Sequence, residues 1–240
     1  RAADFILAEL RREGRLLRTW RDGKSRLTAY LDDYAFLVHG LLNLYEATFD
    51  GRWLDQAVAL TDTAVQFYYD ETDGAFFFTA SDAEKLVARS KDPNDGAVPA
   101  GNSVQALNLL RLAILLDRKD YRAKAESVFR AFGQRAADSP GASETLLCAA
   151  DFYHDTVREI AIIGPLSAPE TAAMLRAVYD HYLPNKVVVH SADDVGESGL
   201  PLLRWKKRIN GQPAAYVCER YNCKLPVTTA DALVKQLKSK

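Results

Sequence analysis

The sequence has few cysteines, almost no methionine and no strong excess of charge of either sign. Among its 240 residues, three are Cys and one is Met, and 31 Lys and Arg against 32 Asp and Glu leave a formal net charge of −1. Three cysteines are too few for the disulfide framework of a small secreted domain and favour a reducing compartment, so we expect a cytoplasmic location. The balanced charge gives no electrostatic reason to expect a nucleic-acid partner.

Long apolar runs and metal-ligand spacings are missing as well. No segment approaches the roughly 20 apolar residues that a membrane-spanning helix needs, which predicts no membrane partner. The four histidines show no zinc-like spacing with one another. We therefore predict neither a metal site nor a cofactor.

A near-repeat of an apolar helix, a short polar break and an amphipathic helix occurs twice in the sequence. Residues 42–67 and 110–132 both follow this pattern, and Trp53 of the first copy aligns with Tyr121 of the second at an offset of 68 residues. A short link between two helices forces them to lie antiparallel, so each copy predicts an αα-hairpin. A fixed period indicates repeated units that stack to share a core.

The two helices of one copy differ in polarity. Residues 104–116 are apolar almost all round, as in a helix covered on several sides, whereas residues 121–134 carry a charged face. An inner layer of buried helices within an outer layer of amphipathic ones is typical of an α/α toroid. The first inner helix, residues 32–48, also carries a polar stripe that should face bulk water or a polar central cavity. The stripe consists of Asp32, Phe36, His39, Asn43 and Glu46.

The pattern changes after about residue 155. Residues 159–163 and 186–190 are typical of buried strands, and the helical stretch 168–182 between them predicts a parallel βαβ unit. The prediction is thus a mainly α fold, with helical hairpins of a toroid over residues 1–155 and a small βαβ-containing C-terminal α/β appendage over 156–240.

The link between the two hairpins, from about residue 70 to 101, is long for a compact domain and is therefore predicted to be structured or functional. Asp73 and Gly74 supply turn residues, residues 75–79 read as a strand, and residues 86–89 are its expected partner.

Topology should bring carboxylates from this link and from the first inner helix to one rim of the toroid. The candidate catalytic residues are Asp32, Asp33, Asp92 and Asp95, with His39 as a possible base. Glycosidase-type chemistry needs two carboxyl groups across a sugar-sized gap, which motivates this assignment. The alternative is structural: an N-cap at Asp32, turns at Asp92 and Asp95, and a capping box from Asn102 to Gln105.

Four groups of residues share their order with a known family. They are Tyr30 to Phe36, Lys91 to Ser103, Pro184 to Val188, and Tyr216 to Thr228. Together they resemble the C-terminal part of the YyaL-like, or spermatogenesis-associated protein 20-like, family, and the resemblance covers almost the whole chain. It implies a longer, thioredoxin-domain-containing protein with a six-hairpin (α/α)6 toroid similar to N-acylglucosamine 2-epimerases and glycosidases.

This resemblance implies a carbohydrate-active or carbohydrate-binding cleft, with Tyr34, Lys91, Asn102 and Ser103 as the expected substrate-binding residues. Tyr34 would stack on a sugar ring. The expected partners are a sugar or sugar derivative and the rest of the same polypeptide, meaning the thioredoxin-like domain and the first hairpins; self-association is the other possibility. Whether the chain is an enzyme, and on which substrate, stays open, because a non-catalytic scaffold would keep the same fold.

The cysteines carry a second interpretation. Cys218 and Cys223 enclose four residues, which is wider than a thioredoxin-type redox pair. They are predicted either to be two buried or incidental thiols or, as redox candidates, to form a dithiol that exchanges with the thioredoxin-like domain. Cys148 lies in an apolar run and is predicted to belong to the core.

Overall fold

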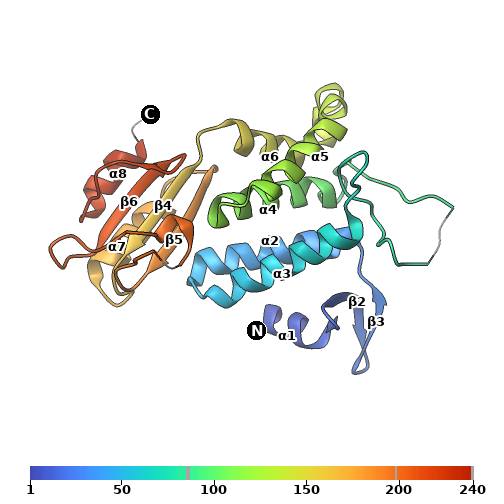
Figure 1. Ribbon diagram of the computed structural model, residues 1–240, viewed down its shortest axis with the longest axis horizontal. Helices are drawn as coiled ribbons and strands as arrows, with labels where there is room; N and C mark the ends of the chain where they lie inside the picture. Colours follow the sequence, from blue (N-terminus) through green and yellow to red (C-terminus); the bar gives the residue numbers. More distant parts are fainter. Residues whose placement is uncertain (85–86, 198, 239–240) are drawn as a thin grey trace. The chain divides into compact units, whose positions relative to one another are not determined.

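Figure 1 shows the computed structural model of the protein, which describes residues 1–84, 87–197 and 199–238. Within these ranges the chain forms eight α-helices and seven β-strands. It divides into two compact units: Arg1–Ala113 with Lys119–Ala150, and Ile114–Arg118 with Asp151–Lys240. Each unit is described below by itself.

The first unit begins with a short helix and a three-stranded antiparallel sheet, to which the sequence analysis assigned no elements. These are α1 (Ala2–Glu9), β1 (Arg11–Arg12), β2 (Arg15–Arg21) and β3 (Lys24–Thr28). Asp22 and Gly23 both have positive φ angles, 53° and 71°, as the tight two-residue turn between β2 and β3 requires. The hydroxyl of Tyr34 ties this sheet to the next helix by accepting the Leu16 N–H at 2.8 Å.

Two helical hairpins follow, in agreement with the near-repeat. Their helices are α2 (Leu31–Thr48), α3 (Gly51–Tyr68), α4 (Gly101–Leu116) and α5 (Lys119–Asp138). Phe49 and Asp117, 68 residues apart, both adopt the left-handed conformation, with φ of 56° and 53°, and so end the first helix of each copy in the same way. Trp53 and Tyr121 are 5% and 1% exposed, so these two aligned aromatic residues both pack in the core.

The link after α3 differs from the prediction in its strand pairing. Residues 75–77 turn back on the end of α3 instead: Phe77 N–H donates to Tyr68 O at 2.8 Å, and Tyr69 forms a bridge with Phe76. The predicted pairing with residues 86–89 is therefore wrong for residues 75–77. Phe78 does reach the end of the predicted partner segment, since its N–H donates to Ser90 O at 2.8 Å. Leu86 lies outside the described residues. The physical reason is proximity, because the Asp73-Gly74 turn brings residues 75–77 directly beside the extended chain that leaves α3.

After η1 (Pro140–Ala142), the unit ends within α6 (Glu144–His154), at Ala150. Cys148 on α6 is exposed, so the prediction that it belongs to the core is wrong. The apolar run around it is shared between two sides of the helix: Leu146 and Ala149 are buried, whereas Leu147 is 41% exposed.

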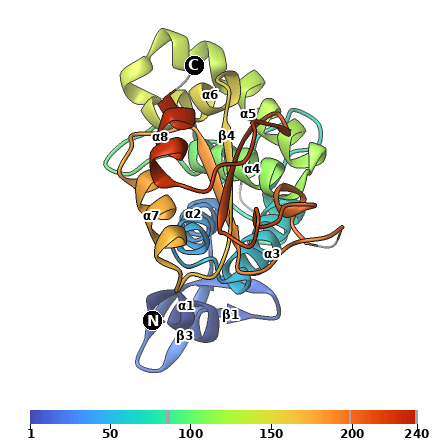
Figure 2. The ribbon, with the colours of Figure 1, turned by 90° about the vertical axis from the view of Figure 1, so that its left-hand side faces the viewer.

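The second unit is built on a four-stranded sheet of order β5-β4-β6-β7. Its elements are β4 (Arg158–Ile163), α7 (Pro169–Tyr179), β5 (Lys186–Ser191), η2 (Pro201–Leu203), β6 (Ala214–Glu219), β7 (Asn222–Cys223) and α8 (Ala230–Lys238). β4 and β5 are parallel and α7 connects them, which confirms the βαβ prediction. β6 and β7 were not predicted. Figure 2 shows α7 and α8 beside each other on one side of this sheet.

Candidate functional site

The beginnings of α2 and α4 meet where Asp32 approaches Gly101. A side chain at Gly101 would collide with the carboxylate of Asp32, so glycine alone permits this close approach. Burial raises the pKa of Asp32, the charges of Asp33 and Asp92 raise it further, and the Gly101 N–H opposes them. Asp32 therefore keeps its proton to a higher pH than an ordinary aspartic acid.

A pocket of about 220 Å³ lies beside this contact. Asp32, Asp92 and Phe78 line it, and the ring of Phe78 stacks on Tyr30 at a centroid distance of 4.5 Å. Two carboxyl groups from distant segments and an aromatic ring thus share one cavity. The sequence analysis missed Phe78 because its position in an apparent strand gave no sign that it borders a pocket.

Asp33 and Asp95 are engaged in backbone capping. Asp33 accepts the N–H of Tyr30, the residue before α2, at 2.8 Å. Asp95 accepts the N–H of Ala100 at 2.8 Å with one oxygen and that of Thr145 at 2.6 Å with the other, so it ties together the starts of α4 and α6. Both carboxylates satisfy amide groups at helix N-termini that have no partner within the helix.

The loop around Asp92 is held by its own polar side chains. Asp92 accepts the N–H of Asn94 at 3.0 Å, and its carbonyl accepts the Asn102 amide at 3.3 Å. Asn102 also bonds both backbone groups of Phe76, at 2.9 Å each, and is 1% exposed. Asn102 thus lies inside α4 and anchors the loop, so the capping-box interpretation from Asn102 to Gln105 is wrong: the helix begins one residue earlier, at Gly101.

The other expected substrate-binding residues have defined places. Lys91 pairs with Asp70 at 2.7 Å and also donates to Gly74 O at 2.7 Å. Its hydrogen bond to the Asp70 carboxylate lowers the pKa of Asp70 to about 2. Tyr34 is 0% exposed, so its ring belongs to the core and has no free face. Ser103 is also fully buried, and its hydroxyl has no hydrogen-bond partner among the described residues.

His39 belongs to a polar contact between α2 and α4 rather than to the pocket. Its Nδ1 lies 3.3 Å from Asn108 Oδ1, and the Asn108 amide donates to Ala35 O at 2.8 Å. Burial lowers the pKa of His39, and the positive charge of Arg111 lowers it further. Three polar residues of the α2 stripe thus contact α4: His39 contacts Asn108, Asn43 accepts a hydrogen bond from Arg111, and Glu46 forms an ion pair with Arg111 at 3.2 Å.

An apolar groove of about 550 Å³ runs along another side of α2. Phe36, Leu37 and Leu44 of the helix line it opposite Ile6 and Leu17 of the preceding segment. Phe36 is 36% exposed. Asp33 and Arg18 also line the groove.

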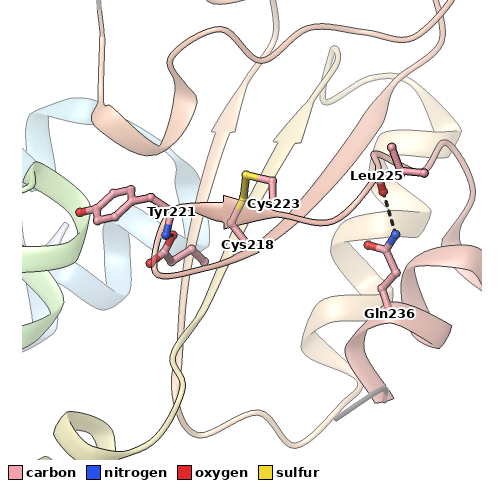
Figure 3. The surroundings of a disulfide bond; sticks show 6 residues. Cys218, Tyr221, Cys223, Leu225 and Gln236 are labelled. Carbon is pink, nitrogen blue, oxygen red and sulfur yellow. Dashed lines mark hydrogen bonds between the residues drawn. A yellow bond between two sulfur atoms is a disulfide. The ribbon is translucent and has the colours of Figure 1, made fainter.

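Cys218 and Cys223 are joined by a disulfide, as Figure 3 shows. The prediction of two incidental thiols is therefore wrong. The pair is a cross-strand pair of β6 and β7, because a two-residue turn at Arg220-Tyr221 places residues five apart directly opposite each other. Cys218 is 2% exposed, whereas Cys223 is exposed.

Within residues 1–84, 87–197 and 199–238, no three His, Cys, Asp or Glu side chains gather in a way that would hold a metal ion. None of the helices in those ranges is long and apolar enough to cross a membrane.

Comparison with known proteins relates the chain to spermatogenesis-associated protein 20. The human protein of that name is 37% identical over 238 residues, covering 93% of this chain and 30% of the relative. The rat protein of the same name is 36% identical over 214 residues, covering 87% and 27%. An uncharacterized protein of Caenorhabditis elegans is 29% identical over 215 residues, covering 88% and 29%.

These relatives are homologues of the chain over most of its length, as the four groups of motifs had indicated. The chain spans less than a third of the length of each of these relatives. No protein-family profile matches it.

Proposed function

We propose that the first unit is part of an (α/α)6 toroid and binds a sugar or sugar derivative in the pocket between α2 and the loop before α4. The observation that carries this proposal is the pairing of Asp32 with Asp92 in one cavity that also has an aromatic wall, Phe78. Polar groups that converge on a cavity beside an aromatic surface suit a ring with hydroxyl groups on its edge and an apolar face.

The two carboxyl groups have different environments, as acid and base chemistry requires. The half-buried Asp32 has a raised pKa and suits the protonated partner. Asp92 is exposed on the loop and lines the same cavity. In this proposal the other three candidates have supporting roles. Asp33 and Asp95 hold the ends of helices, and His39 belongs to the α2–α4 contact; together they help to position Asp32.

A thermal-shift screen of the intact protein against sugars, sugar phosphates and nucleotide sugars tests this proposal. A ligand at a hundredfold excess over its dissociation constant stabilises the folded state by about 2.7 kcal/mol. Asp32→Asn and Asp92→Asn should abolish the shift, and Asp22→Asn, in the exposed β2–β3 turn, is the matched control. No saturable shift across the panel, or a shift that survives both pocket variants, would refute the proposal.

The resemblance adds a proposed partner. The rest of the polypeptide, with a thioredoxin-like domain and further hairpins, would pack on the exposed apolar side of α2; a second copy of the chain is the other possible occupant. The groove that Phe36 and Leu37 line supports this proposal. Phe36→Ser should weaken that association in analytical ultracentrifugation, and a Phe36→Ser variant that associates as tightly as the parent would contradict it.

A second proposed function is thiol–disulfide exchange at Cys218–Cys223 with a thioredoxin-like dithiol. The disulfide favours this function because its two cysteines differ in exposure: Cys223 is exposed, whereas Cys218 is buried. An incoming thiolate reaches an exposed cysteine far more easily than a buried one. The replacement of both cysteines by serine in the intact protein should remove the exchange, whereas Cys148→Ser, on the exposed side of α6, should leave it intact. An unchanged exchange rate in the double variant would exclude this function.

A further inference from the structure

A buried carboxyl group lies next to the disulfide in the sheet. Glu159 of β4 is the cross-strand partner of Cys218, which in turn is the partner of Cys223. Residues directly opposite each other in antiparallel strands project to the same face, with Cβ atoms about 4.5–5.5 Å apart. Glu159 is 4% and Cys218 is 2% exposed, so the two side chains start from adjacent positions on one buried face of the sheet.

The same carboxylate holds the turn that joins the two cysteines. Arg220 and Tyr221 both have positive φ angles, 51° and 63°, which residues other than glycine rarely adopt and which cost free energy. The Tyr221 N–H donates to Glu159 Oε2 at 3.0 Å and so helps to keep the turn in this conformation. Figure 3 shows Tyr221 at this turn, next to the cysteine pair.

The charges around Glu159 are few and opposed. Burial raises the pKa of Glu159, and the negative charge of Glu219 raises it further. Three groups lower this pKa: the Tyr221 N–H, the positive charge of Lys206 and the Arg220 N–H. Burial in turn lowers the pKa of Lys206, against the attraction of Glu159. Glu159 is thus a carboxyl group able to hold a proton beside Cys218.

The outer sulfur faces a different environment. Cys223 lines a surface pocket of about 450 Å³ together with Arg220, Lys224 and Glu219. Two positive charges against one negative charge favour the approach of a thiolate. An external dithiol therefore meets Cys223 first, and Cys218 is the leaving sulfur.

We propose that Glu159 exchanges a proton with the Cys218 sulfur during thiol–disulfide exchange, and so acts as the positioning and proton-holding residue of this pair. This inference rests on the second proposed function. A thiolate of the incoming dithiol bonds to Cys223 Sγ as the Cys218–Cys223 bond breaks. The electron pair leaves on Cys218, which takes the proton of the Glu159 carboxylic acid. The second thiol of the reductant loses its proton to solvent and attacks the mixed disulfide, releasing Cys223 as a thiolate. The dithiol loses two electrons, and the cysteine pair gains them.

The pH dependence of reduction tests this role. The intact protein is reduced with excess dithiothreitol at a series of pH values, and the two cysteines are followed by differential alkylation and peptide mass spectrometry. Glu159→Gln keeps an oxygen that can accept the Tyr221 N–H but cannot supply a proton. We expect reduction at near-neutral pH to slow by about tenfold, below the usual range for general acid–base catalysis because dithiothreitol is itself reactive. We also expect the variant's pH profile to follow the ionisation of dithiothreitol alone.

Glu170→Gln is the control, because Glu170 is an exposed carboxylate in the first turn of α7 in the same unit. It should keep the parent profile. A Glu159→Gln variant with the parent rate and profile would overturn the role of Glu159 while leaving exchange itself intact. A parent protein whose cysteines are never found paired, or whose disulfide resists dithiothreitol unless unfolded, would instead refute the exchange function.

A second measurement covers the case in which Glu159→Gln does not fold. The carboxyl pKa of Glu159 can be followed by carbon NMR in the unaltered protein, oxidised and reduced. A proton shared with Cys218 requires that this pKa differ between the two redox states. Identical titration curves would overturn the proposal.

Discussion

Replacement of Arg111 by methionine should destabilise the protein by about 3 kcal/mol, because it removes one partner of an ion pair that is largely withdrawn from water. The side chains of Arg111 and Glu46 are 8% and 13% exposed, and Nη2 lies 3.2 Å from Oε1. Arg111 Nη1 also donates to Asn43 Oδ1 at 2.9 Å. Removal of one member of a buried pair costs about 3–5 kcal/mol since the other charge stays buried, and the partial exposure of Glu46 favours the lower end.

Urea unfolding followed by circular dichroism measures this loss. In thermal unfolding of a chain of this length, the same loss should lower the melting temperature by about 6–12 °C. Arg122→Met is the control, because the Arg122–Glu126 pair on α5 is 48% and 32% exposed. It should cost about 0.5 kcal/mol or less, and high salt should cancel only this smaller effect.

The double variant Arg111→Met with Glu46→Leu distinguishes the cost of losing the whole ion pair from the cost of leaving one charge without its partner. It should recover about half of the loss or more, because no uncompensated charge remains between α2 and α4. Equal losses in Arg111→Met and Arg122→Met, or no recovery in the double variant, would refute the view that this contact is shielded from water.

Three further predictions follow from the contacts of the first unit. The pKa of His39 is lowered in the folded state, so the stability that His39 contributes is present above pH 6.5 and is lost as the pH falls through its folded pKa. His39→Gln should therefore make the free energy of unfolding in urea less dependent on pH between about pH 7 and 5. Gly101→Ala forces a methyl group against Asp32 and should cost about 1–3 kcal/mol in the same assay. Tyr121→Phe removes the 2.6 Å hydrogen bond to Asp62 and should cost about 1 kcal/mol, read as a lower urea midpoint at an unchanged slope.

The helical hairpins and the βαβ unit were predictable because their signals are local. The apolar period of residues 104–116 and the strand runs at 159–163 and 186–190 each report burial within one segment. The repeat even extends to the backbone, where Phe49 and Asp117 end their helices in the same left-handed conformation. Aspartate at position 117 tolerates this conformation, whereas nothing about Phe49 predicts it from the sequence.

Pairing between segments was harder to predict, because a strand pattern says nothing about its partner. Residues 75–77 bond to the end of α3, since the turn before them brings the two together. Cys218 and Cys223 are disulfide-bonded although their spacing is wider than that of a redox pair, because the turn at Arg220-Tyr221 contains neither glycine nor asparagine and so gave no hairpin signal.

The roles of the candidate carboxylates were also difficult to predict from the sequence. Whether an aspartate caps a helix or serves a pocket depends on which N–H groups reach its oxygens, and the sequence places both kinds on the same loops and first turns. Asp95 has both oxygens occupied by backbone amides, whereas Asp32, in the first turn of α2, stays half-buried beside a cavity with a raised pKa. The glycine at position 101 decides between these roles for Asp32, because any larger residue would fill the space that its carboxyl group uses. The absence of a side chain at a distant position thus defines the candidate acid, and this information is not contained in the residues around Asp32 itself.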